Sequence, residues 1–488
     1  MRGTAGFCWS SDVSLVVGNK AHNASRYFMK KSASLPPHAP TPGPEFKEHV
    51  AAGMALRKGT PRSSHADWAP PRKRRDVIKL LKQSNIGRIP ELVPFRFGRM
   101  LQSPFYFLRG APSVMADDLA ATPVSKLKVQ ACGDCHLMNF GEFGTPERNL
   151  IFDINDFDET LAGPWEWDIK RLAASVMVAA RHRNFPERSC LDAVHASVAS
   201  YRKKMAEFAR MSPLQRWYAR INAQDLVKLG PTQKVRRTRA EEAAHARAQT
   251  AQHLMVKTTE IIDGKRHIKD DPPLAFHPTH DPGFDAEIRA FFHHYRHTLP
   301  NDRKVLLDQY ELVDVAMKVV GVGSVGTRCA IALFMADEHD PLFLQYKEAR
   351  ASVLEPYHGK SPYGNHGQRV VEGQKLMQSA SDIFLGWARS EETGIDYYVR
   401  QLRDMKSSIL IETVSLPELV DYAGFCGWAL ARAHAKSGDP AAISGYLGRT
   451  DVFDLAIGTF AQTYADQTEA DYAMLKKAVA DGRVVAQM

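Results

Sequence analysis

Two segments decide how this chain is interpreted: CGDCHLMN at residues 132–139 and IFDINDFD at residues 151–158. Asp134 precedes Asn139 by five positions, and a second acidic cluster begins at the end of an apolar run. Enzymes that move a phosphoryl group from ATP need one Asp to accept or orient the attacking hydroxyl. They also need an Asn and a second Asp to hold Mg²⁺ against the phosphates. The two segments therefore predict phosphoryl transfer.

The composition is that of a globular protein with more than one lobe. The chain has 488 residues, of which 44% are apolar and 24% are charged, and this length exceeds one ordinary core. Nothing approaches 18 consecutive apolar residues, so we expect no spanning helix and no membrane partner. Six cysteines form no disulfide framework. Together with the lack of a convincing signal peptide, they predict reduced thiols and a cytoplasmic location.

The positive charge is concentrated at one end of the chain. Residues 1–110 carry 19 Lys/Arg against 6 Asp/Glu, a net charge of +13, so the overall charge of +9 leaves −4 for residues 111–488. The densest basic cluster, residues 72–75, is interpreted as a solvated helix start or linker, with a phosphate or anionic partner as the alternative. Basicity confined to one end gives no strong indication of nucleic-acid binding.

Composition shifts divide the chain into four parts. Residues 1–60 are expected to be a disordered or linker tail, because residues 32–44 are too rich in proline for a helix or a central strand; Met54 is an alternative start. Residues 61–310 are expected to form a helical large lobe that carries the catalytic and metal motifs. Residues 311–410 form a small β-rich nucleotide-binding lobe, and residues 411–488 are C-terminal helices that complete the large lobe.

A glycine-rich segment, with Gly321, Gly323, Ser324 and Gly326, lies at the start of the β-rich part. A dinucleotide-binding fold would open a helix at the third glycine, but residues 327–334 are β-rich and soon turn back. Two interpretations remain open. One is a structural hairpin without a ligand, and the other is a loop whose backbone amides cover nucleotide phosphates.

Lys347 follows on the second strand of the same predicted hairpin. Burying an unpaired ammonium is costly, so a lysine on a half-buried strand needs a partner. In a kinase the partners are the nucleotide phosphates and a Glu on the next helix, and Glu372 is the candidate for that Glu. Glu348 is adjacent to Lys347 and would point to the opposite face of the strand. A surface lysine on an edge strand is the alternative.

The motif from Gly133 to Asn139, followed by Asp156-Phe157-Asp158, resembles the signature of aminoglycoside-phosphotransferase-like and choline-kinase-like enzymes. The resemblance implies that ATP and Mg²⁺ are cofactors, that Asp134 is the catalytic base with His136 beside it in the catalytic loop, and that Asn139 and Asp156 bind the metal. Cys132 stands where these enzymes usually have His.

Two acidic residues near this motif need separate assignments. Asp153 competes with Asp156 as metal ligand, and Asp156 is preferred because it precedes Asp168 by twelve positions, a gap comparable to that in such kinases. Asp168 is expected to cap its helix and to brace the catalytic loop. Two other interpretations of the whole cluster remain. Cys132 and Cys135 with His136 could form half a zinc site or a redox pair, or the carboxylates could merely cap loops.

The order of the motifs is unusual, because Asp134 precedes Gly321 by almost two hundred residues, whereas kinases have the Gly-rich loop first. We therefore expect an α+β, two-lobed, protein-kinase-like fold that is circularly permuted, with the small lobe inserted late in the chain. The segment from Trp428 to Ala435 resembles the kinase helix that leads into the catalytic loop. His434 within it is expected to be a packed or capping histidine.

From about Thr60 to Ala480 the chain also resembles a bacterial family known as domain of unknown function 2252. The segments that carry this resemblance are residues 88–94, 97–100, 132–139, 152–159, 163–168, 321–327 and 464–467. The family implies no established activity, so the function rests on the residues. We expect an ATP- and Mg²⁺-dependent phosphotransferase that acts on an unidentified small-molecule or protein hydroxyl. The alternatives are a kinase-fold AMP-transferase and a non-catalytic nucleotide-binding or regulatory protein.

Overall fold

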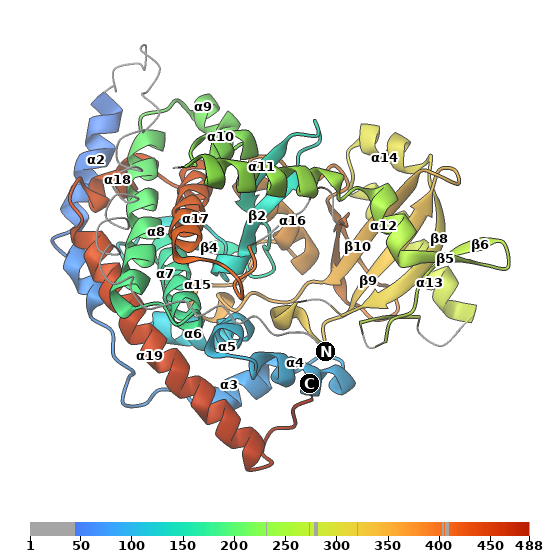
Figure 1. The fold of residues 1–488 in the computed structure, drawn as a ribbon, viewed down its shortest axis with the longest axis horizontal. Helices are drawn as coiled ribbons and strands as arrows, with labels where there is room; N and C mark the ends of the chain where they lie inside the picture. The colour runs from blue at the N-terminus through green and yellow to red at the C-terminus, as the bar shows by residue number, and fades with distance from the viewer. Residues whose placement is uncertain are drawn as a thin grey trace, which may run out of the picture. The chain divides into compact units, whose positions relative to one another are not determined.

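The computed structural model describes residues 44–230, 232–272, 274–277, 282–319, 321–402, 405 and 409–487. They form the mixed α and β structure that the sequence predicts, with many helices and one main sheet (Figure 1). Within these residues, no helix combines the length and the apolar content needed to cross a membrane.

The tail predicted over residues 1–60 differs from the structure where the structure describes it. Residues 1–43 lie outside the described residues, but α2 (Pro44–Leu56) is a helix that packs on α18 (Pro440–Leu447). Glycine permits this close approach, because a Cβ on Gly53 would overlap the carbonyl of Ala442. The proline-rich composition of residues 32–44 therefore says nothing about the helix that begins where it ends.

Four long helices form the centre of the helical part: α7 (Trp165–His182), α8 (Glu187–Phe208), α17 (Leu416–Ser437) and α19 (Val452–Ala480). They pack side by side around one large apolar core (Figure 1). Every residue of α7 from Trp165 to Ala180 is buried, including Asp168 and Arg171. A helix with this burial lies inside the protein rather than on its surface.

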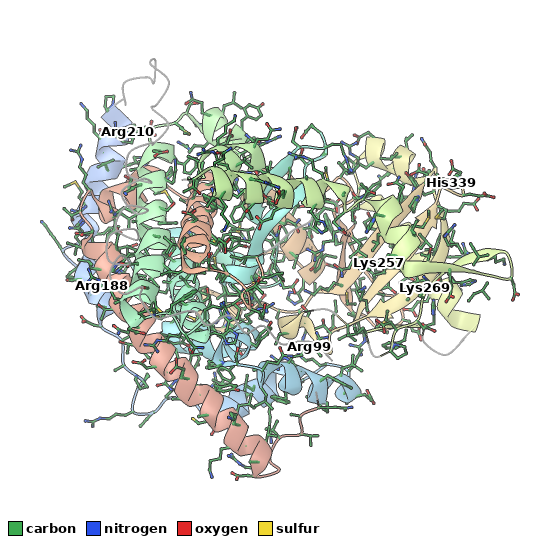
Figure 2. All side chains as sticks on the ribbon, in the orientation of Figure 1. Arg99, Arg188, Arg210, Lys257, Lys269 and His339 are labelled. Atoms are coloured by element: carbon green, nitrogen blue, oxygen red, sulfur yellow. The ribbon has the colours of Figure 1, made fainter. Side chains whose placement is uncertain are left out.

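Shorter helices surround this centre. They are α3 (Val77–Ser84), α4 (Val93–Met100), α5 (Pro104–Gly110), α6 (Pro112–Leu119), α9 (Pro213–Tyr218), α10 (Ala223–Lys228) and α11 (Gln233–Ala248). Helix α12 (Ala251–Thr258) instead packs on the main sheet. Exposed basic side chains are spread over separate elements, as Arg188 on α8, Arg210 after it and Lys269 show (Figure 2).

The main sheet is antiparallel, with the order β11-β12-β10-β9-β8-β7. Its strands are β7 (Ala275–Phe276), β8 (Glu311–Lys318), β9 (Cys329–Met335), β10 (Pro341–Glu348), β11 (Gly386–Arg389) and β12 (Asp396–Gln401). Leu344 and Tyr346 of β10 pack on one face of the sheet, and Phe343 belongs to the apolar cluster on the other. Since side chains alternate along a strand, Lys347 shares the face of Phe343.

Helices α13 (Pro282–His297) and α14 (Asn301–Leu307) belong with this sheet. Phe291, Tyr295 and Leu307 share one apolar cluster with Leu344 and Val399 of the strands. The boundary predicted at residue 310 therefore separates helices from the strands on which they pack. It was placed where the sequence texture becomes β-rich, and that change does not mark where a core begins.

Two short antiparallel pairs position the motifs at residues 132–139 and 151–158. They are β1 (Lys128–Ala131) with β4 (Leu161–Pro164), and β2 (Phe140–Gly144) with β3 (Leu150–Ile154). β3 coincides with the apolar run that leads into the second acidic cluster. A third pair, β5 (Thr259–Ile262) with β6 (Lys265–Ile268), forms a hairpin that projects beside the main sheet (Figure 1). Helices α15 (Glu355–His358) and α16 (His366–Met377) connect β10 to β11.

Candidate active site

Asp168 of α7 braces the loop that carries Asp134 by accepting hydrogen bonds from its backbone. The Asp168 carboxylate accepts hydrogen bonds from the backbone N–H groups of Cys132 at 2.6 Å and Gly133 at 2.9 Å. His434 of α17 is fully buried, with Nε2 3.1 Å from the same carboxylate. The bracing role predicted for Asp168 and the packed role of His434 are thus confirmed. The predicted cap is wrong, because α7 begins three residues earlier, at Trp165.

Gly133 turns the chain so that Asp134 faces a cavity. Its φ of +83° lies in the left-handed region, and a Cβ there would overlap the carbonyl oxygen of Glu159. Only glycine meets both requirements without strain. The Gly-Asp pair of the motif is therefore a geometric requirement of this turn.

The carboxylate of Asp134 is held by one oxygen. Oδ1 accepts hydrogen bonds from Nε of Arg171 at 2.9 Å and from Nη2 at 2.6 Å. Burial raises the pKa of Asp134 and the nearby Asp156 adds to the rise, whereas Arg171 opposes both. The other oxygen, Oδ2, lies 3.9 Å from Nε2 of His136. Burial holds the pKa of His136 well below its usual range, so this imidazole is neutral.

Asn139 lies at the end of a short 3-10 turn, η3 (Leu137–Asn139), in the same loop. Its side-chain Nδ2 donates to the backbone carbonyl of Asp134 at 2.7 Å, and its own carbonyl accepts from the N–H of Asn155 at 2.8 Å. The amide nitrogen is therefore used inside the loop, and the amide oxygen is the atom left to face a ligand.

The structure separates the two candidates for the second acidic ligand. Asp153 is fully buried, and its carboxylate binds Arg432 at 2.8 and 2.9 Å and accepts from the N–H and hydroxyl of Ser379. Asp156 instead lines the cavity, with Oδ1 accepting from the N–H of Asp158 at 3.2 Å. The geometry favours Asp156 as a ligand-binding residue, because the carboxylate of Asp153 is already occupied.

Lys347 forms its ion pair with Asp158 and not with the predicted Glu372. The hydroxyl of Tyr398, which faces Lys347 across the sheet, donates to the other oxygen of Asp158 at 2.8 Å. Burial alone would lower the pKa of Lys347, whose side chain is 4% exposed, but Asp158 raises it above its ordinary value. The lysine is therefore charged in spite of its burial.

Glu372 takes no part in this arrangement. It lies on α16 and pairs with Lys375 of the same helix at 3.6 Å. Helix α16 instead directs Arg369 toward the site, where its guanidinium donates to the carbonyls of Asp158 and Thr160. Glu348 pairs with Arg328 at 3.2 Å, which agrees with the expectation that it would not serve Lys347.

The glycine-rich segment is a firmly anchored turn. The guanidinium of Arg88 donates to the carbonyls of Gly323 at 2.9 Å and Val325 at 2.6 Å, and the N–H of Ile89 donates to the carbonyl of Gly326 at 2.7 Å. A short 3-10 turn, η4 (Val322–Ser324), packs against α4 and α5. The segment is therefore fixed against the helical part.

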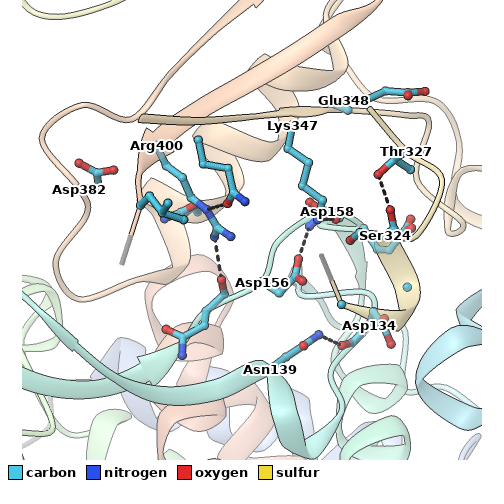
Figure 3. Close-up of a pocket in the computed structure, with 18 of the residues that line it drawn as sticks. Asp134, Asn139, Asp156, Asp158, Ser324, Thr327, Lys347, Glu348, Asp382 and Arg400 are labelled. Carbon is cyan, nitrogen blue, oxygen red and sulfur yellow. Dashed lines mark hydrogen bonds and ion pairs between the residues drawn. The ribbon is translucent and has the colours of Figure 1, made fainter. Parts of the chain in front are cut away.

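These groups face one cavity of about 1390 Å³. Figure 3 shows Asp134 and Asn139 on one side, with Lys347 reaching toward them from its strand. The predicted residues that line the cavity are Asp134, His136, Asn139, Asp156, Gly321, Gly323, Ser324 and Lys347, whereas Gly326 and Glu372 do not line it. Side chains from segments far apart in the sequence therefore meet at one cavity.

A comparison with protein families matches residues 88–478 to a family described as an uncharacterized protein conserved in bacteria, domain of unknown function 2252. The chain belongs to this family. Neither the curated proteins nor the solved structures gave a match. The matched region contains the braced loop, the main sheet and α17, so most of the cavity lies within the family domain. Of the lining residues, Arg75, Leu80, Gln83 and Ser84 precede the matched region.

The two cysteines of the motif, Cys132 and Cys135, do not have the geometry of a metal site. Cys132 and Cys135 are buried thiols. Their mutual hydrogen bond lowers the pKa of Cys132, but burial and the neighbouring carboxylates raise it to about 11. Among the residues that the structure describes, no three His, Cys, Asp or Glu side chains form a group that could hold a metal ion. Both thiols lie in the apolar core of the helical part.

Sequence reasoning missed several polar residues of the site. Asp158 belongs to the quoted acidic cluster, but nothing local pairs it with Lys347. Arg400 of β12 lines the cavity and binds the carbonyl of Asn155. Glu159 also lines it and accepts from the N–H of Val353 at 2.7 Å. Arg109 of α5 is a further lining residue. The only available signal for these residues was their position near a motif or on a predicted strand.

Proposed function

We propose that this protein is an ATP- and Mg²⁺-dependent phosphotransferase that acts on a small-molecule or protein hydroxyl in the cytoplasm, on a circularly permuted kinase-like fold. The observation that carries the proposal is the convergence on one cavity of Asp134, Asn139 and Asp156 with Lys347, almost two hundred residues later in the chain. Phosphoryl transfer needs this set: a base, two oxygen ligands for Mg²⁺ and a cation for the phosphates.

The order of elements in the sheet supports a nucleotide-binding lobe. Strand β8 leads into the glycine-rich turn, β9 follows, β10 carries Lys347, and the short helix α15 and then helix α16 come after it. Protein kinases have a Gly-rich loop, a lysine strand and a helix in the same order. In this chain α17 follows the sheet, and through His434 it contacts Asp168, the residue that braces the loop. A permuted kinase would require that contact.

The residues present fit Mg²⁺ bound together with a nucleotide. Asn139 and Asp156 supply oxygen donors, which Mg²⁺ prefers, and this ion commonly takes one or two protein ligands, with water and phosphate oxygens completing its shell. When bound, Mg²⁺ would neutralise charge on the phosphates. Two protein ligands therefore suffice.

The chain's own groups would divide the work as follows. Arg171 holds Oδ1 of Asp134 and leaves Oδ2 to accept the proton of the attacking hydroxyl. The bond from the acceptor oxygen to the terminal phosphorus forms as the bond to the ADP oxygen breaks. Lys347, kept charged by Asp158, would donate to the phosphates. The neutral His136 would pack beside Asp134 without competing for its proton.

Nucleotide binding and turnover, measured on the same variants, test the proposal. With ATP and Mg²⁺ at a hundred times the dissociation constant, the wild type should gain about 2.7 kcal/mol of stability in a thermal shift. Lys347→Ala should lose most of this gain, and the exposed-lysine control Lys269→Ala should keep it. Asp134→Asn should keep the gain and lose turnover.

The products and the wild-type response decide between the alternatives. ADP among the products supports phosphoryl transfer, whereas AMP transfer would release pyrophosphate instead. Turnover by Asp134→Asn equal to that of the wild type would refute the catalytic base. A wild type that shows no shift with any nucleotide would refute the proposal itself.

A further inference from the structure

Arg109 is a largely buried cation that has no hydrogen-bond or ion-pair partner among the described residues. It lies near the end of α5, with Cζ 5.3 Å from the ring centre of Tyr106 and 5.8 Å from that of Phe105. Its Nε is buried without a hydrogen-bond partner. Across the described residues, no ion pair or hydrogen bond joins its guanidinium to another group, although it lines the cavity.

Three neighbouring arginines already have hydrogen-bond partners within the protein. Arg171 binds Asp134, Arg88 binds carbonyls of the glycine-rich turn, and Arg96 donates to the carbonyl of Gly110 at 2.6 Å. Burying a cation without a partner costs free energy, and burial lowers the pKa of Arg109. A chain that keeps such a group in a cavity leaves a place for an anion.

The surroundings of Arg109 indicate which anion. A Cβ placed on Gly323 would lie 3.7 Å from the backbone carbonyl oxygen of Arg109. The glycine-rich turn is therefore directly beside the backbone of Arg109. The negative charges of Asp134 and Asp156 also act on Arg109, and each of them raises its pKa. These two carboxylates repel each other and would repel a phosphate. Arg109 therefore lies near both the glycine-rich turn and the two acids.

We propose that Arg109 binds the terminal phosphoryl group of the nucleotide and stabilises its charge during transfer to the acceptor oxygen. This inference rests on the proposed function. The guanidinium gains and loses no proton: its N–H groups donate to phosphoryl oxygens while the bond to the acceptor forms and the bond to ADP breaks. Its planar fork suits phosphate better than an ammonium does.

The test compares binding of ATP and ADP, each with Mg²⁺, by titration calorimetry. A hydrogen-bonded arginine on the terminal phosphate should favour ATP over ADP by roughly 10- to 100-fold in the wild type. Arg109→Met, which keeps apolar contact with the two rings, should bind ADP as the wild type does and lose the preference for ATP. Arg109→Lys should keep part of it, and the exposed control Arg188→Met, on α8 (Figure 2), all of it.

Turnover gives a second readout and separates the ways of failing. Arg109→Met should lower turnover by roughly 10³-fold or more. A variant that keeps the wild-type ATP preference would overturn the inference while leaving the proposed function intact. Loss of both nucleotides in Arg109→Met, with full preference in Arg109→Lys, would show a packing role and also overturn it. A wild type that binds neither nucleotide would overturn both proposals.

Discussion

Asp153→Asn should destabilise the protein far more than Asp156→Asn, although the two residues are three positions apart. Asp153 is fully buried and neutralises Arg432, whose Nε and Nη1 have no partner within the described residues. Removing one member of a buried ion pair costs about 3–5 kcal/mol, because the other charge stays buried alone. Asp156 lines the cavity, and its substitution should change stability by about 0.5 kcal/mol at most.

The cost converts into a measurable melting shift. The unfolding entropy of globular proteins is about 2.1 cal/mol/K per residue, or roughly 1 kcal/mol/K for a chain of this size. Asp153→Asn should therefore lower the melting temperature by about 3–5 °C without ligand at pH 7, followed by circular dichroism. Asp156→Asn should melt within about 1 °C of the wild type and lose Mg²⁺-dependent nucleotide binding instead.

Two outcomes would refute this reasoning. If Asp153→Asn melts with the wild type, the buried pair contributes no stability. If Asp156→Asn loses as much stability as Asp153→Asn, the assignment of one residue to structure and the other to the ligand is wrong. The double variant Asp153→Asn with Arg432→Met should recover most of the loss, since it buries no lone charge.

Three further predictions concern the loop around Asp134. Burial raises the pKa of Glu159 to about 7 from an ordinary 4.5; its stabilising contribution is complete below pH 4.5 and is lost as pH rises to 7. The melting temperature of Glu159→Gln minus that of the wild type should therefore increase over this range, and a difference independent of pH would contradict the assignment. Asp168→Asn should weaken the brace on two backbone amides and lower turnover at least tenfold, while ATP affinity in calorimetry stays within about twofold. Gly133→Ala should lower stability by about 1–3 kcal/mol in denaturant titration, whereas Gly321→Ala, which has open space around it, should change stability little.

Local spacing predicted the parts of the site that lie within one segment. Asp134, Asn139 and Asp156 all line the cavity, and Asp168 braces the loop, because these residues are held by turns and short strands that the sequence pattern reveals. The mixed α and β character and strand β3 were predictable for the same reason.

Contacts between distant segments could not be predicted in this way. The partner of Lys347 is Asp158, 189 residues earlier, and not Glu372 on the adjacent helix. The orientation of α16 about its own axis directs Arg369, and not Glu372, toward the site. That orientation depends on packing. Arg109 carries no motif at all. Its proposed role rests on the absence of a hydrogen-bond or ion-pair partner among the described residues, which only coordinates can show.

The contacts that hold the loop around Asp134 have a consequence for biosynthesis. Asp168 and His434 are 266 positions apart, and Asp153 and Arg432 are 279 apart. A ribosome that adds roughly 5–20 residues per second needs about 13–55 s to supply these partners after the loop has emerged. During that interval the nascent chain carries an unneutralised Asp153, an Asp168 without His434 and an exposed face of α7. The loop can reach its final geometry only once α17 has been translated, so the cavity cannot be complete before the chain has been made as far as Ser437.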